Sequence, residues 1–564
     1  MKKISFSSPL LYFILLSLII VSCKAKNSGP SKEIINEINL KRGAVISCGP
    51  SGEQFGVVAF DIAGSEKIKK DFNLAIKLLH SFEYDEAEKV FAKIIDAEPG
   101  YAMAYWGVAM CSFHALWTPP SEAELKKGSK AIAIAQFITQ KTKREAGYID
   151  AIAAFYKDWD KIDHHSRCSY FEKGMEKLYT AYPGDKEAAI FYALSLDASA
   201  DPADKLYKNQ KKAGAILNAL YPGEPDHPGI IHYIIHTYDY PELATLALPA
   251  ARKYASVAPS SAHALHMPSH IFTRLGLWDE CINSNLVSVT SAKCYAEEAG
   301  IKGHWDEELH GLDYLVYGYL QKGDNISAKK QWDYLNTITD VSSSNFKVAY
   351  AYAAIPARYV LENKNWTEAA DLKLYPANFP WQNFPWQKAI YHFARLMGAV
   401  NMGKIDSAKA ELNTLHAIYD TLLKQKDSYK ANQVLIQVKT AEAWIQLKEG
   451  KQIEALKLMN AATEMEDKTE KHPVTPGEII PARELLGDMF LLINKPQQAL
   501  DAYEEDLKKH PNRFNAVYGA GLASERSGNR EKAKLYYRQL LTFVNPANCN
   551  RPELTAINLF LKKK

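Results

Sequence analysis

The sequence predicts an all-α protein, an α-solenoid in which helical hairpins stack side by side. Three observations lead to this prediction. A period of 34 residues recurs near the C-terminus, one type of turn signature recurs through the middle of the chain, and no stretch shows a convincing strand alternation. The composition agrees, because 26 Pro and 29 Gly in 564 residues are few for a sheet protein dense in turns.

The period is clearest in the last two units of the chain. Three pairs of positions are displaced by 34 residues: Gly487 and Gly521, Ala499 and Ala533, and Tyr503 and Tyr537. This spacing is the tetratricopeptide repeat pattern. Its small residues let two antiparallel helices approach, and its aromatic ring fills the gap to the next unit. We therefore expect tetratricopeptide-type helical hairpins.

Turn signatures continue between the first and last repeats while the period lengthens. Examples are Gly276-Leu277-Trp278-Asp279-Glu280, Lys322-Gly323-Asp324 and Glu449-Gly450-Lys451, each followed a few residues later by Ala or Cys. Successive signatures lie 39 to 47 residues apart, which predicts longer helices than in the standard unit.

These patterns predict the division of the chain. At the start of the chain, Ile20-Val21-Ser22-Cys23 resembles a bacterial lipobox, which implies a lipoprotein signal peptide over residues 1–22 and a lipidated cysteine with an N-terminal tether over 23–66. Residues 67–336 read as N-terminal helical repeats with a His-rich centre, 347–465 as middle helical repeats, and 479–564 as C-terminal tetratricopeptide units. The loop-like stretches 337–346 and 466–478 lie at the joints.

The first 22 residues have the layout of a leader. Lys2 and Lys3 precede an apolar run over residues 9–21, which is too short to span a hydrocarbon core of ~30 Å. The run ends in Ile20-Val21-Ser22-Cys23, which resembles the bacterial lipoprotein lipobox. The resemblance implies cleavage before Cys23, lipidation of Cys23 and, with Lys24 following, an outer-membrane location in the bacterial envelope. The alternative is an ordinary cleaved signal peptide with an incidental cysteine.

The net charge and the cysteine content indicate which partners and which cysteine chemistry to expect. Lys and Arg number 68 against 65 Asp and Glu, so nothing favours a nucleic-acid partner. Six cysteines follow Cys23 without CxxC spacing. An exported chain can pair them, but we predict no particular disulfide and interpret Cys111 and Cys281 as small buried side chains.

Histidines concentrate in the middle of the chain. Eight of the 16 fall between 227 and 310. His227 and Pro228 read as a helix start, after which His232 and His236 lie four apart on one face. His263, His266 and His270 follow at i, i+3 and i+7, with Pro268 between them as a predicted kink. His310, flanked by Glu307 and Asp313, forms a third group.

If the three helices adjoin, their imidazoles form a metal site. The predicted ligands are His232, His236, His266, His270 and His310. Zinc, copper and iron all accept imidazole. HExxH is absent, so no built-in general base accompanies His232 and His236. The alternative is that these histidines are interior hydrogen-bonding groups that fix helix crossings.

An aromatic duplication follows the His-rich region. Asn378-Phe379-Pro380-Trp381-Gln382 is repeated at once as Asn383-Phe384-Pro385-Trp386-Gln387, and its prolines exclude a continuous helix. Exposed rings here would stack on a sugar or peptide ligand. The alternative is an inter-helix loop whose Trp side chains plug the superhelix.

Several segments together resemble a family of bacterial tetratricopeptide repeat lipoproteins of mostly unassigned activity. They are Leu78-Leu79-His80-Ser81-Phe82, Ala102-Met103-Ala104-Tyr105-Trp106-Gly107, His227-Pro228-Gly229, His266-Met267-Pro268-Ser269-His270-Ile271-Phe272, His310-Gly311-Leu312-Asp313-Tyr314-Leu315, Ile355-Pro356-Ala357-Arg358-Tyr359 and Pro511-Asn512-Arg513-Phe514-Asn515. The HMPSH block is the most distinctive. The resemblance implies an exported repeat protein and supplies no reaction.

Three functions remain open from the sequence. The first is a lipid-anchored envelope scaffold that binds a protein or peptide partner in a concave groove. The second is a metal-binding protein or metal-dependent enzyme that uses the central histidines. The third is an accessory lipoprotein of glycan or nutrient utilisation that uses the aromatic loop. No catalytic residue is assigned, and the sequence favours a non-enzymatic role without deciding it.

Overall fold

The computed structural model describes residues 29–49, 54–116 and 118–562, and within them the regular structure is helical. The one β feature of this part is an isolated parallel bridge between His304 and Val341. The predicted all-α solenoid is confirmed. The expected leader and Cys23 lie outside the described residues. Among the helices described, none combines the length and apolar character that a membrane span requires.

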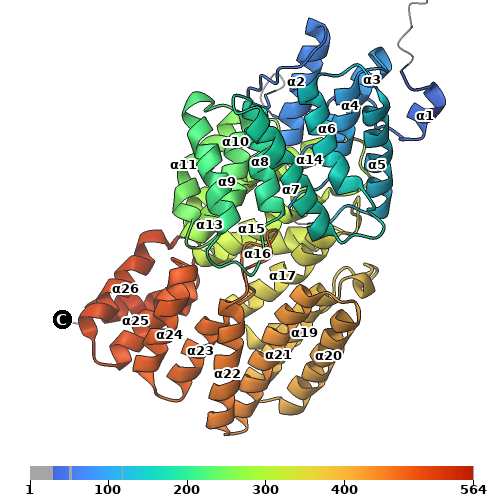
Figure 1. Cartoon of the computed structure of the whole chain (residues 1–564). Coiled ribbons are helices and arrows are strands. Elements are labelled where there is room, and N and C mark those ends of the chain that lie inside the picture. Colours follow the sequence, from blue (N-terminus) through green and yellow to red (C-terminus); the bar gives the residue numbers. More distant parts are fainter. Residues whose placement is uncertain (1–28, 50–53, 117, 563–564) are drawn as a thin grey trace, which may run out of the picture.

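In the described residues, the helices of the N-terminal part of the solenoid run from α1 to α16 (Figure 1). They are α1 (Lys32–Asn36), α2 (Glu66–His80), α3 (Tyr84–Ala97), α4 (Ala102–Cys111), α5 (Glu122–Phe137), α6 (Lys143–Tyr156), α7 (His164–Ala181), α8 (Lys186–Ala198), α9 (Lys208–Leu220), α10 (Pro228–Thr237), α11 (Ala244–Val257), α12 (Ala262–His266), α13 (Pro268–Leu275), α14 (Trp278–Glu298), α15 (Asp306–Gln321) and α16 (Asn325–Leu335). A 3-10 turn, Tyr221–Gly223, follows α9.

The remaining helices form the middle and C-terminal parts, which lie below the N-terminal part in Figure 1. They are α17 (Phe346–Glu362), α18 (Trp366–Ala370), α19 (Pro385–Asn401), α20 (Ile405–Lys424), α21 (Ser428–Lys448), α22 (Gln452–Asp467), α23 (Ala482–Leu492), α24 (Pro496–Lys509), α25 (Phe514–Arg526), α26 (Arg530–Phe543) and α27 (Pro552–Lys562). A 3-10 turn, Trp381–Asn383, precedes α19. From α2 to α26 most helices pack against the next one in the chain, as a solenoid requires.

Local sequence explains where these helices begin and end. Ser121 and Thr142 each form a capping box with the Glu three residues later, which satisfies the free amides at the starts of α5 and α6. His227 caps α10, with Pro228 in its first turn, as the sequence predicts. Gly276 ends α13 in a left-handed conformation, where glycine carries no steric penalty.

The repeat glycines occupy the positions that the period predicts. A Cβ atom added at Gly487 in α23 would lie 2.6 Å from the Tyr503 ring in α24, and one added at Gly521 in α25 would lie 2.5 Å from the Tyr537 ring in α26. No side chain fits at such distances. The 34-residue spacing of Gly and Tyr therefore reflects the close packing of a helix backbone against a Tyr ring in each of these two hairpins.

Two large apolar cores follow one another along the chain. The first draws on residues 35–314 and the second on residues 282–502, and smaller clusters complete the C-terminal units. The change of core falls at α14 and α15, because Tyr314 belongs to the first core and Leu315 to the second. This change of core precedes the loop at 337–346, which the sequence predicts as the joint between the N-terminal and middle repeats.

The described part of the expected N-terminal tether is packed against the solenoid. Phe55, Phe60 and Ile62 are buried in the first core, and the amide of Val57 donates to the carbonyl of Asp226 over 2.9 Å. These apolar residues hide surface that a solvated tether would expose. The stretch is therefore an integral segment of the fold, which differs from the expectation for residues 23–66.

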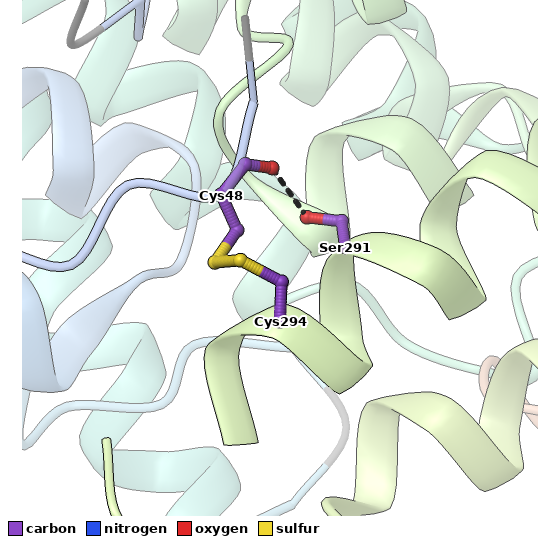
Figure 2. The surroundings of a disulfide bond; sticks show 3 residues. All are labelled: Cys48, Ser291 and Cys294. Carbon is purple, nitrogen blue, oxygen red and sulfur yellow. Dashed lines mark hydrogen bonds between the residues drawn. A yellow bond between two sulfur atoms is a disulfide. The ribbon is translucent and has the colours of Figure 1, made fainter. Parts of the chain in front are cut away.

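A disulfide between Cys48 and Cys294 joins this segment to α14 (Figure 2). Next to it, the Ser291 hydroxyl donates to the Cys48 carbonyl oxygen over 2.9 Å. No pattern in the sequence distinguishes this pair, because the two residues are 246 positions apart. Cys111 and Cys281 are buried free thiols, as interpreted from the sequence.

We expect the Cys48→Ser/Cys294→Ser variant to be less stable than the oxidised wild type by about 2–5 kcal/mol, because the bond closes a long loop in the unfolded chain. Denaturant unfolding followed by Trp fluorescence measures the difference. The Cys549→Ser variant, which leaves the disulfide in place, is the matched control. Equal stability of the oxidised wild type and the double variant would contradict the prediction.

Candidate metal centre

Four helices bring the predicted histidines together in the interior. His232 and His236 come from α10, His266 and His270 from α12 and α13, and His310 from α15. The structure divides them into two groups and adds His263 of α12 to one. The His232 triad consists of His232, His236 and His263, and the His266 triad consists of His266, His270 and His310. Within each triad, one side-chain nitrogen per residue lies within 4.8 Å of the others.

Pro268 shapes the His266 triad. The helix is interrupted where the kink is predicted, since α12 ends at His266 and α13 begins at Pro268, while Met267 between them keeps a helical backbone conformation. His266 and His270 nonetheless stay on one side of the chain, with their Nε2 atoms 3.1 Å apart. The His310 ring lies 4.2 Å from the His266 ring, centroid to centroid.

Hydrogen bonds fix the tautomers of His266 and His270. The Asn285 amide nitrogen donates to the Cys281 carbonyl oxygen over 2.8 Å, so the Asn285 oxygen accepts from His266 Nδ1 over 2.6 Å. The Asp239 carboxylate accepts from His270 Nδ1 over 3.1 Å. We therefore assign both protons to Nδ1. The Nε2 lone pairs of the two rings then face each other.

Facing lone pairs repel unless a cation lies between them. Two nitrogens 3.1 Å apart match the separation of two ligands that share one ion at bond lengths of about 2.0–2.1 Å. Burial lowers the pKa of His266, His270 and His310 below the ordinary value, so all three rings are neutral near pH 7. Neutral imidazole is the form that binds a metal ion.

Asp239 anchors one side of this arrangement. Its carboxylate accepts from Arg274 Nε over 2.8 Å and from Lys471 Nζ over 2.9 Å, in addition to His270. Burial by itself raises the pKa of Asp239, but Lys471 and Arg274 outweigh burial and hold it well below the ordinary value. Lys471 belongs to the 468–481 loop, so the C-terminal half of the chain helps to orient His270.

A third buried group provides a contrast. His80 and His227 each place Nε2 2.9 Å from a Glu187 oxygen, and both donate to this carboxylate. Their Nδ1 atoms accept from the Tyr233 hydroxyl over 2.9 Å and from the Ile230 amide over 3.4 Å. Every ring nitrogen in this group has a hydrogen-bond role, so it is a structural network that ties α2, α8 and α10 together.

The two carboxylates beside His310 have different roles. Asp313 forms a buried ion pair with Arg358, which excludes it from the ligands. Glu307 pairs with Lys347 and has an oxygen 3.9 Å from His263 Nδ1. Glu307 therefore supplies negative charge next to the His232 triad.

A cavity of about 520 Å³ lies between the N-terminal and C-terminal halves of the chain, next to the His232 triad. His236, Asp239 and Arg274 line it from one half, and Lys471 and His472 line it from the other. His236 is the partly exposed member of the two triads, and the other five rings are buried. The cavity therefore reaches the candidate metal centre through His236.

The aromatic duplication does not offer a stacking platform. Phe379, Trp381 and Trp386 are buried in the second core, and Trp381 Nε1 donates to the Pro376 carbonyl oxygen over 3.0 Å. This arrangement corresponds to the alternative interpretation, in which the rings plug the superhelix. The sugar-stacking hypothesis for this loop is wrong for these three rings because solvent does not reach them.

Comparisons with known proteins assign no function to this chain. No protein-family model matches the sequence, and no curated protein matches it. Yeast Tom70 is similar in structure at 11% identity, over 88% of this chain and 96% of that chain, with a TM-score of 0.33. The human IFIT1 dimer with m7Gppp-AAAA has 11% identity over 86% and 96%, with a TM-score of 0.31. The P58(IPK) TPR domain has 15% identity over 67% and 100%, with a TM-score of 0.20.

Sequence reasoning missed three contributors to the site. His263 was noted in the histidine spacing but omitted from the ligands. Asn285 and Asp239 lie outside the histidine groups and carried no signal of their own. Their contacts with His266 and His270 arise only when α14 and the segment after α10 pack against α12 and α13.

The cavity histidine His472 predicts a pH effect. Burial lowers its pKa to about 3, against 6.5 in an unfolded chain. The folded state therefore stays neutral while the unfolded state binds a proton as the pH falls through about 6.5, and stability is lost below that pH. Between pH 7.5 and pH 5 we expect this residue to account for a loss of about 1–2 kcal/mol.

The variant His472→Phe tests this effect, because Phe keeps the ring contact with Phe346, whose centroid is 4.2 Å away, and does not titrate. Urea unfolding at pH 7.5 and pH 5 gives the loss of stability of wild type and of variant. The difference between these two losses is the contribution of His472. An equal loss of stability in both proteins would show that His472 does not contribute.

Proposed function

We propose that this helical repeat protein binds a transition-metal ion in the His266 triad. The single observation that carries the proposal is the pair of facing Nε2 lone pairs on His266 and His270, each created by a hydrogen bond that holds the proton on Nδ1. Metal-ligating histidines are held in this way, with the second nitrogen donating to a carboxylate or carbonyl oxygen.

The ligand chemistry limits the ion. An imidazole set suits zinc, copper and iron, and among divalent ions the Irving–Williams order favours copper. His310 completes a three-nitrogen set within 4.8 Å. A bound ion would supply positive charge and Lewis acidity, and the chain would supply orientation through Asn285 and Asp239 and exclusion of water through burial of the rings.

We expect the purified chain, after chelation and reloading with Zn²⁺, to retain at least one ion per molecule. The variant His266→Asn/His270→Asn should lose that ion, because Asn keeps a donor near the Nδ1 position and removes Nε2. Inductively coupled plasma mass spectrometry measures the content, and circular dichroism checks folding.

The matched control for this variant is His392→Asn, which removes a buried ring of α19 that is bonded to Glu411 and belongs to none of the histidine groups, and should leave the metal content unchanged. Less than about 0.1 ion per molecule in the reloaded wild type would overturn the proposal.

We also propose that the protein is a lipid-anchored protein of the bacterial outer membrane, with a protein or peptide partner as a secondary role of its stacked hairpins. The lipobox resemblance at Cys23 supports the anchor. The Cys48–Cys294 disulfide supports export, because such bonds persist in oxidising compartments. Several acyl chains on one residue would give stable anchoring, at ~0.8 kcal/mol per buried CH₂.

Replacing the lipidation residue tests the anchor. The full chain expressed in a bacterial host should label with an alkyne fatty acid and fractionate with membranes, whereas Cys23→Ala should lose the label and the membrane association. Cys549→Ala is the control and should behave as wild type. Unlabelled wild type, or membrane association that survives Cys23→Ala, would contradict the anchor.

A further inference from the structure

The His232 triad, on neighbouring helices, shares one feature of the His266 triad, a ring whose Nδ1 proton is held by an acceptor. His232 Nδ1 lies 2.6 Å from the His80 carbonyl oxygen, which accepts its proton. Nε2 of His232 therefore carries a lone pair, and it lies 3.0 Å from Nε2 of His236. The His263 ring follows at 5.1 Å from the His232 ring, centroid to centroid. The three rings thus converge on one point between α10 and α12.

The structural network fixes the orientation of this triad. The His80 carbonyl that accepts from His232 belongs to the last residue of α2, and the His80 side chain is held by Glu187 and Tyr233. Phe82 adds an apolar wall, with its ring 4.4 Å from the His232 ring. A ligand ring held by a backbone carbonyl and enclosed by apolar groups is the usual surrounding of a metal-binding histidine.

The two triads are close enough to form one centre. The His236 and His270 rings, one from each triad, are 6.3 Å apart between centroids. Carboxylates flank both sides, with Asp239 bonded to His270 and Glu307 3.9 Å from His263. Two cations near each other need such negative charge, since like charges repel strongly in a buried site.

The His232 triad also has an entry path. His236 lines the cavity of about 520 Å³ between the halves of the chain, so an ion can reach this triad from the cavity. None of the three His266-triad residues lines that cavity among the described residues. The His232 triad is therefore the accessible side of the centre.

We infer that the chain binds two transition-metal ions, the second held by His232, His236 and His263 and open to the cavity through His236. This inference rests on the proposed function, in which the His266 triad holds the first ion. The two ions share one buried centre and differ in their access to solvent.

The test is the metal stoichiometry of four proteins after reloading with Zn²⁺. Wild type should hold two ions, the His232→Asn/His236→Asn variant one, the His266→Asn/His270→Asn variant one, and the combination of all four substitutions none. The buried control His392→Asn, on α19 and outside the histidine groups, should hold two. Stepwise titration of wild type with Co²⁺, followed by visible absorption, counts the sites without relying on any variant, and it should saturate after two equivalents.

The outcomes separate the two proposals. One ion in wild type that survives His232→Asn/His236→Asn would overturn the second site and leave the proposed function in place. One ion that is lost with either pair would show a single site shared between the triads, and would also overturn the inference. No ion in wild type, with Co²⁺ titration flat, would overturn the proposed function itself.

Discussion

The centre of this molecule depends on the hydrogen bonds and ion pairs that the Asp239 carboxylate forms. The carboxylate accepts from Arg274 in α13, from Lys471 in the 468–481 loop and from His270. Removing this carboxylate would deprive two buried cations, Arg274 and Lys471, of their shared partner, which is costly. One side chain thereby joins the two halves of the solenoid and sets the tautomer of a histidine. The architecture and the candidate site are coupled through this group.

Other buried ion pairs reinforce the junction of the halves. Arg513 at the start of α25 is fully buried and donates to Glu362 of α17 over 2.7 Å and to Glu484 of α23 over 2.8 Å. Trp278 Nε1 of α14 donates to the Asn512 carbonyl over 2.9 Å. A solenoid with contacts only between neighbours would flex along its length. These long-range bonds attach the C-terminal units to α14 and α17.

Buried histidines have two different roles in this protein, one in a structural network and one in the candidate metal site. In the His80 and His227 network all protons and lone pairs are matched, so the rings stabilise the crossing of α2, α8 and α10. In the His266 triad the Nδ1 protons of His266 and His270 are matched and their Nε2 lone pairs face each other, with the Tyr314 hydroxyl 3.4 Å from His270 Nε2 as a weak donor. The difference lies in the acceptors around each ring. A carboxylate at Nε2 gives a structural pair, whereas acceptors at Nδ1 direct Nε2 toward a common point.

The sequence by itself determined the helical class, the hairpin stacking and the helix starts, because these follow from local spacing, capping residues and the 34-residue placement of Gly and Tyr. It also placed the histidines on a few helices. Only the tertiary structure decided which rings meet, since His263, Asn285 and Asp239 enter the site through packing between helices far apart in the chain. The disulfide of Cys48 and the burial of Phe55, Phe60 and Ile62 were decided at the same level, because a contact between distant segments leaves no periodic trace in either one.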